Sequence, residues 1–138
     1  MKPEKVFVYG TLRTGGPTTL LSGYRLWEVV TEGGVCLYPA ILPAEPHETV
    51  VGEILAVSSL DLRVLDRYEG YDPDNTENSQ YLRTRVSIDN QSVWTYVWSP
   101  SRASRRWEEG PLPYGIYLRE TPHRDWADID RGFFPESR

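Results

Sequence analysis

The chain of 138 residues is long enough for one domain, expected to span residues 1–138, and its 25% charged and 39% hydrophobic residues are typical of a globular protein. A net charge of −5 argues against a nucleic-acid partner, because phosphate binding needs a concentrated positive field. The single cysteine, Cys36, excludes an intrachain disulfide, and with only two histidines, far apart, we expect neither a metal nor a cofactor.

We expect neither a signal peptide at the N-terminus nor a membrane helix in this sequence. The first ten residues lack the apolar region of a signal peptide, and no run approaches the roughly 20 apolar residues of a membrane helix. We therefore expect a cytoplasmic protein without a membrane partner. The basic run SRASRR at residues 101–106 is followed by the acidic WEEG, which favours a solvated loop over an anion clamp at a site edge.

The first half of the chain predicts mainly extended structure. Residues 6–9 form a continuous apolar run ending at a glycine, which is typical of a strand buried on both faces. The loop TLRTGGPTT follows; its amides suit an anion, although a plain turn is the commoner structure for such a loop. Residues 20–30 fit a short helix or a strand equally. Residues 35–43 contain two prolines, which predicts an edge strand or an extended loop over the core.

A strand and a helix are expected next. Residues 49–58, TVVGEILAVS, predict a strand in which Glu53 is either an inward-facing acid or part of the polar face. Residues 58–70, SSLDLRVLDRYEG, predict a helix with a capping box at Ser58 and a C-terminal cap at Gly70. Its buried apolar face is expected to comprise Leu60, Val64, Leu65 and Tyr68.

The second half predicts a loop, a hairpin and a tail. YDPDNTENSQ is polar and acidic, and the aromatic and β-branched runs YLRTRVSI and SVWTYVWS on either side of DNQ predict an antiparallel hairpin. Residues 107–138 form a Pro- and Trp-rich tail that we expect to pack on its own domain, because Trp126, Phe133 and Phe134 need a surface to cover them. The oligomeric state stays open.

These elements together predict a mixed α/β domain of the α+β kind. Its sheet should be largely antiparallel and curled into a small barrel, with a few helices beside it.

Glu69, in LDRYEGYDP, is the residue whose position is least ordinary. Most glutamates are surface acids. A carboxylate in the last turn of a helix, however, opposes the helix dipole, and here Tyr68 and Tyr71 flank it. The dipole disfavours the charged carboxylate, and the two tyrosines are expected to shield it from water. Both effects raise the pKa of Glu69, as suits a group that takes up and releases a proton near neutral pH.

A family resemblance gives these positions a context. VFVYGTLRTG, YPAI, VVGEILAV, LDRYEGY, YLRTRV and WTYVW occur in that order over about residues 5–98, and in this the chain resembles the γ-glutamylcyclotransferase-like family. Its small AIG2-like branch, which includes γ-glutamylamine cyclotransferases, is the most similar part. The resemblance implies a small β-barrel with helices packed outside it, in agreement with the elements above.

The resemblance also implies roles for particular residues. The catalytic glutamate corresponds to Glu69. The loop that holds the γ-glutamyl head through backbone amides corresponds to Tyr9, Gly10, Thr11 and Leu12, and Tyr81 and Tyr96 match aromatic positions that line or support the pocket.

The implied reaction converts a small-molecule γ-glutamyl amine or peptide to 5-oxoproline, with Glu69 as general acid and base and no metal or enzyme nucleophile. A non-catalytic module that binds a γ-glutamyl compound or carboxylate on the same fold is the alternative, and an interaction role for the Trp-rich tail is compatible with both. The acidic loop after Glu69 is longer than is usual in the family; it is either a pocket rim that favours cationic amines or a solvated excursion.

Overall fold

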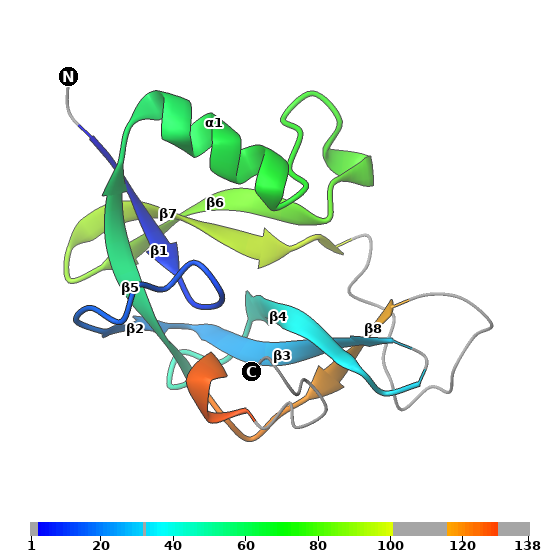
Figure 1. Ribbon diagram of the computed structural model, residues 1–138. Helices are drawn as coiled ribbons and strands as arrows, with labels where there is room; N and C mark the ends of the chain where they lie inside the picture. The colour runs from blue at the N-terminus through cyan, green and yellow to red at the C-terminus, as the bar shows by residue number, and fades with distance from the viewer. Residues whose placement is uncertain (1–2, 32, 101–115, 130–138) are drawn as a thin grey trace.

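A computed structural model describes residues 3–31, 33–100 and 116–129 (Figure 1). The described residues form eight strands, one α-helix and two short 3₁₀ helices. In chain order these are β1 (Glu4–Val8), β2 (Thr19–Ser22), β3 (Tyr24–Thr31), β4 (Cys36–Pro43), β5 (Thr49–Val57), α1 (Ser59–Tyr68), η1 (Thr76–Asn78), β6 (Tyr81–Ile88), β7 (Gln91–Trp98), β8 (Ile116–Glu120) and η4 (Trp126–Asp128).

The strands make two sheets, one of five strands in the order β2-β5-β1-β7-β6 and one of three in the order β4-β3-β8. Among the described pairs, β1 runs parallel to β7 and all the others are antiparallel. The edge strands β2 and β6 contact each other, so the larger sheet curls, and α1 lies along its outside (Figure 1). The predicted mixed, mostly antiparallel α+β fold is confirmed, as a curled half-barrel with one α-helix among the described residues.

Strand β1 is at the centre of the larger sheet. Val6, Phe7 and Val8 are almost fully buried, as the apolar run predicted. Phe7 faces Ile54 of β5, and β7 flanks the other side. Because β1 ends at Val8, the chain leaves the sheet at Tyr9, whose side chain is still buried, and enters the loop beside the cavity described below.

The segment that fitted either a helix or a strand forms two strands. Gly23, with φ +85°, lies between β2 of the larger sheet and β3 of the smaller, so the chain changes sheet at this residue. Glycine takes this left-handed conformation at little cost. The proline-containing segment is β4, an edge strand of the smaller sheet.

The predicted hairpin is confirmed, with a tighter turn than the spacing suggested. β6 and β7 are joined by two residues, Asp89 (φ +50°) and Asn90 (φ +65°), as in a type I′ turn. The hairpin carries Tyr81 at its start and Tyr96 near the end of its second strand.

The ends of helix α1 agree with the prediction, but its buried face does not. Ser58 accepts the Asp61 amide at 3.0 Å, and Gly70 (φ +71°) ends the helix. The predicted apolar face was wrong as a buried face: three of its four residues are mostly exposed, with exposed fractions of 73% for Leu60, 62% for Val64 and 64% for Tyr68.

The helix instead turns Leu62 and Asp66 inward. The Tyr96 hydroxyl donates to Asp66 at 2.7 Å, and an Arg83 nitrogen lies 3.1 Å from its other carboxylate oxygen. A buried carboxylate with two such partners is tolerated, so the covered face of the helix can carry Asp66 beside Leu62.

The described part of the tail contributes to the smaller sheet. β8 pairs with β3, and Trp126 is only 5% exposed within the apolar core. The basic run at 101–106 and the pair Phe133 and Phe134 lie outside the described residues. Within the described ranges, no helix has the length and apolar character needed to cross a membrane.

Candidate active site

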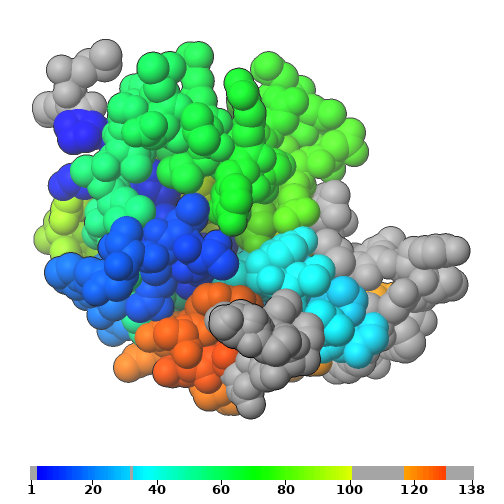
Figure 2. All heavy atoms as spheres, in the orientation of Figure 1, coloured from blue at the N-terminus to red at the C-terminus, as the bar shows by residue number. Residues whose placement is uncertain are grey.

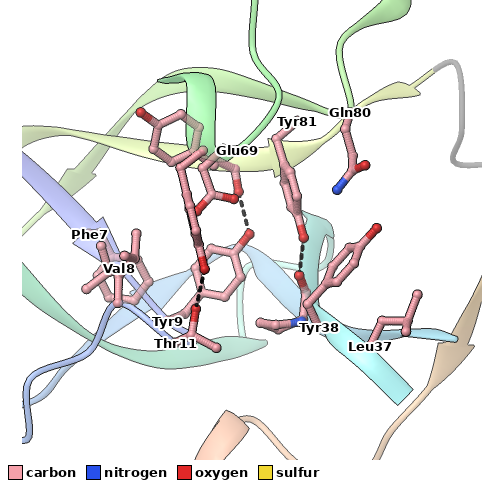
Figure 3. A pocket seen from close by; sticks show the side chains of 14 residues that line it. Phe7, Val8, Tyr9, Thr11, Leu37, Tyr38, Glu69, Gln80 and Tyr81 are labelled. Atoms are coloured by element: carbon pink, nitrogen blue, oxygen red, sulfur yellow. Dashed lines mark hydrogen bonds between the residues drawn. The ribbon is translucent and has the colours of Figure 1, made fainter. Parts of the chain in front are cut away.

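A cavity of about 240 Å³ opens where the end of β1, strand β4, the end of α1 and the start of β6 meet (Figures 2 and 3). Its lining comes from four segments and one further residue: 7–12, 37–39, 68–69, 80–81 and Tyr96. Segments far apart in the sequence therefore supply one small concave surface, the usual form of a small-molecule site.

All the residues to which the family resemblance gave a role in the site lie on this cavity. They are Tyr9, Gly10, Thr11, Leu12, Glu69, Tyr81 and Tyr96. The acidic residues of the following loop do not: Asp72, Asp74 and Glu77 are absent from the lining, to which that loop contributes only Gln80.

Glu69 is the C-cap residue of α1. Its amide donates to the Leu65 carbonyl at 2.9 Å, and Gly70 then turns the chain away, which leaves the side chain facing the cavity (Figure 3). Burial raises the pKa of Glu69 to about 7, because loss of water disfavours the charged form. The described lining contains no other carboxylate and no lysine, arginine or histidine, so Glu69 alone among these residues can exchange a proton near neutral pH.

Of the two tyrosines expected to shield Glu69, only Tyr68 lines the cavity. Tyr71 is turned toward Arg83, whose guanidinium carbon lies 5.6 Å from the ring centre. The positive φ of Gly70 changes the chain direction between them, so the two rings do not flank the carboxylate symmetrically.

Two buried tyrosines, Tyr9 and Tyr81, line the cavity beside Glu69 (Figure 3). Tyr9 donates its hydroxyl to the Tyr96 carbonyl at 2.5 Å, and Tyr81 donates to the Pro39 carbonyl. Burial raises the pKa of both phenols, and the negative charge of Glu69 adds to the shift. Both hydroxyls stay protonated at neutral pH. The Tyr81 proton is engaged by a carbonyl, which leaves the lone pairs of that oxygen as acceptors, whereas the Tyr9 oxygen also has a hydrogen bond with the Ile41 backbone.

The loop that follows Tyr9 makes close contacts on both sides. The Thr11 hydroxyl lies 3.3 Å from the Tyr68 hydroxyl at the end of α1. A methyl group at Gly10 would lie 2.7 Å from Cγ of Pro39, closer than real Cβ contacts allow. Glycine at this position therefore lets the loop approach β4.

The backbone amides of this loop divide into two groups. Those of Thr14 and Gly15 donate to the protein's own Glu53, at 2.8 Å and 3.0 Å. In the described part of the chain, no hydrogen bond is found from the amides of Thr11 and Leu12, two residues that line the cavity. The loop thus does bind a carboxylate, but an internal one, and leaves two further donors beside the pocket.

Sequence reasoning missed two polar members of the lining, Tyr38 and Gln80. Tyr38 belongs to the YPAI motif, which offered a signal. Gln80 directly precedes Tyr81 and had none, because its direction is set when its amide donates to the Gly70 carbonyl at 2.9 Å. No group of three or more His, Cys, Asp or Glu side chains in the described ranges is arranged to hold a metal ion.

Comparison with protein families identifies the family of the chain. The family described as gamma-glutamyl cyclotransferase, AIG2-like, matches residues 6–126. That range contains every residue of the cavity lining. No curated protein sequence matches the chain.

Solved structures with a similar fold include an uncharacterized protein from Pyrococcus horikoshii, 16% identical, covering 98% of this chain and 99% of that one, with a TM-score of 0.56. The protein ytfP from Escherichia coli is 25% identical, covers 91% and 98%, and has a TM-score of 0.50. An AIG2-like protein from Mus musculus is 26% identical over 91% of this chain and 99% of that one, with a TM-score of 0.48.

Proposed function

The chain belongs to the AIG2-like gamma-glutamyl cyclotransferase family, and from this premise we propose that it cyclises a γ-glutamyl amine or peptide to 5-oxoproline and releases the amine. The observation that carries the proposal is the position of Glu69. It is the sole carboxylate of the described lining, and its pKa of about 7 lets it act both as base and as acid at neutral pH.

The reaction is an internal acyl transfer. The α-amine nitrogen of the substrate forms a bond to its own γ-carbonyl carbon, which closes a five-membered ring, and the bond from that carbon to the leaving nitrogen then breaks. No water is consumed. Holding the chain in a folded, attacking geometry can supply up to about 7 to 11 kcal/mol in well-oriented cases, so positioning is the main task of the cavity.

Proton transfer falls to Glu69. An α-amine has a pKa near 8 and is mostly protonated at neutral pH, so it must lose a proton to attack. The ionised Glu69 takes that proton and returns it to the departing amine, which leaves the enzyme in its starting state. The two transfers require a group whose two forms are similar in free energy, as a pKa of about 7 provides.

The remaining polar groups suit the rest of the substrate. The amides of Thr11 and Leu12 are donors for the α-carboxylate or for the oxyanion that develops on the γ-carbonyl. The hydroxyl oxygen of Tyr81, whose proton is engaged by the Pro39 carbonyl, is an acceptor for the α-ammonium group.

The test is incubation with a panel of γ-glutamyl compounds while 5-oxoproline is measured. The panel includes glutathione, γ-glutamyl-lysine and γ-glutamyl amino acids, because a fold does not specify the leaving group. We expect release of 5-oxoproline from at least one compound, and its loss in a folded Glu69→Gln variant. Glu45→Gln is the matched control, since Glu45 is exposed and lies outside the cavity lining.

Two results would contradict the proposal. Turnover that persists in Glu69→Gln would remove the proton carrier from the scheme. Saturable binding without turnover across the panel would favour the non-catalytic binding module.

A further inference from the structure

Glu53 is a buried carboxylate that the proposed reaction does not use. It lies in the middle of β5, faces Val8 of β1 in the sheet, and is 2% exposed. It is not part of the cavity lining. Burying a charge costs much free energy unless the charge is paired and hydrogen-bonded. The partners of Glu53 therefore show which part of the chain it holds in place.

Those partners all come from the loop after β1. Glu53 accepts the Thr14 amide at 2.8 Å, the Thr14 hydroxyl at 2.8 Å and the Gly15 amide at 3.0 Å. The Nε of Arg13 lies 3.3 Å from the same carboxylate. These contacts, the Thr14 amide foremost, lower the pKa of Glu53 to about 2, so the carboxylate is ionised and acts only as an acceptor.

Arg13 extends the cluster to a third segment. Its Nη1 lies 2.5 Å from the Asp125 carboxylate, which also accepts the Ala127 amide at 2.9 Å at the start of η4. Strand β5, the loop and η4 are thereby tied together. The three residues of this cluster, Arg13, Glu53 and Asp125, are called the clamp below.

The clamp holds one half of a short loop whose other half borders the cavity. Gly10, Thr11 and Leu12 line the cavity, and the Arg13 amide donates back to the Gly10 carbonyl at 3.1 Å. Because residues 13–15 are anchored to the sheet, the two free amides of Thr11 and Leu12 have a defined place. A structural ion pair without this role also exists: Arg119 lies 2.8 Å from Glu28, which is 9% exposed in the smaller sheet.

We propose that Glu53 is a positioning residue, which fixes the loop at residues 10–15 so that its free amides face the substrate. The expected effect of Glu53 on turnover rests on the proposed function, whereas its anchoring of the loop does not. The proposal gives a role to Glu53 in the VVGEILAV segment. This residue lies 39 and 38 residues along the chain from Thr14 and Gly15, whose amides donate to it.

The test is Glu53→Gln, which keeps the size of the side chain but removes the charge and half of its acceptor capacity. We expect kcat/KM to fall on the order of 10²-fold, since a misplacement of about 1 Å costs that much. The acid limb of the pH profile should stay in place, because Glu69 is untouched. Glu53→Asp, which retains the charge, should recover part of the loss.

Glu28→Gln is the matched control, because it removes an ion-paired, buried carboxylate outside the cavity lining. It should keep kcat/KM within about twofold of the unmodified protein. If Glu53→Gln is too unstable to study, Thr14→Ala removes one of the contacts and should produce a smaller loss in the same direction. Equal losses in Glu53→Gln and Glu28→Gln at equal Tm, or an unchanged kcat/KM in folded Glu53→Gln, would overturn the proposal.

Amide hydrogen exchange gives a readout that does not depend on turnover. Exchange at Thr14 and Gly15 should accelerate in Glu53→Gln and stay unchanged in Glu28→Gln. If the unmodified protein forms no 5-oxoproline, the proposed function fails, while the exchange rates still decide whether Glu53 holds the loop. Unchanged exchange at both amides would refute the positioning role whatever the activity.

Discussion

The hydroxyl of Tyr9 donates to the main-chain carbonyl of Tyr96 at 2.5 Å, and so joins residues 87 positions apart beside the candidate catalytic carboxylate. Both side chains are buried. Tyr9 directly follows β1, and Tyr96 lies in β7 of the hairpin. The bond fixes the start of the loop at residues 10–15 against β7, and its removal is the first experiment that the structure suggests.

Tyr9→Phe should lower the free energy of unfolding by about 1 to 2 kcal/mol, because a buried carbonyl loses its donor while the ring remains. Denaturant unfolding measures this change, with an unaltered m-value as the sign that the fold is intact. Tyr24→Phe is the control: Tyr24 is half-buried, and no hydrogen bond of its hydroxyl is found among the described residues. Equal losses in the two variants would mean that the bond to Tyr96 contributes nothing.

The dependence of activity on pH should follow Glu69. The active complex contains one proton, shared between the Glu69 carboxylate and the substrate amine. As Glu69 loses its proton, kcat/KM should therefore rise through about pH 7, the pKa of this residue. It should fall above about pH 8, where the amine of the free substrate loses its proton. Initial rates at low substrate concentration across pH 5 to about 10 measure the profile. An acid limb near 4.5, the ordinary value for a glutamate, would show that burial does not raise this pKa.

Stability should depend on Glu69 in the opposite sense from an ordinary salt-bridged acid. Its pKa is raised from 4.5 to about 7, so between these values the folded state binds more protons than the unfolded state, and stability falls as pH rises. Glu69→Gln should therefore be more stable than the unmodified protein above pH 7, by roughly 3 kcal/mol at most.

The advantage should vanish below about pH 4.5, where both states carry the proton. Thermal unfolding of the two proteins at pH 4 and pH 8 gives the comparison, with Glu45→Gln as a surface control. A stability difference that is the same at both values would indicate a change in packing and not in ionisation.

Features decided by neighbouring residues were predictable from sequence. The left-handed cap at Gly70, the turn between β6 and β7 and the buried run of β1 each follow from local chemistry, since few residues adopt those conformations or tolerate that burial. The grouping of Glu69 with residues 9–12 and Tyr81 rested on motif order, not on geometry.

Features decided by distant partners were not predictable. Periodicity selected the outer face of α1 because it counts apolar residues, whereas the inner face includes Asp66, which pairs with Tyr96 and Arg83 from the hairpin. For the same reason the two readings of Glu53 stayed open, since the amides that make it an inward-facing acid belong to another segment. A pattern within one element carries no information about such contacts.

Gly10 provides the most direct test of the loop geometry. In Gly10→Ala the new methyl would lie 2.7 Å from Cγ of Pro39, so either the loop or β4 must move. Gly10 precedes the amides of Thr11 and Leu12 and lines the cavity, so a shift of the loop would displace these donors. We expect kcat/KM to fall at least about tenfold, since a misplacement of about 1 Å can cost on the order of 10²-fold. Gly33→Ala is the matched control, since its nearest contact would be a Thr31 hydroxyl at 3.8 Å and its φ is not positive. Steady-state kinetics on both variants, each checked for an unchanged far-ultraviolet spectrum, separates a displaced loop from general unfolding. Unimpaired turnover in Gly10→Ala would mean that the close approach of this loop to Pro39 is not needed for activity.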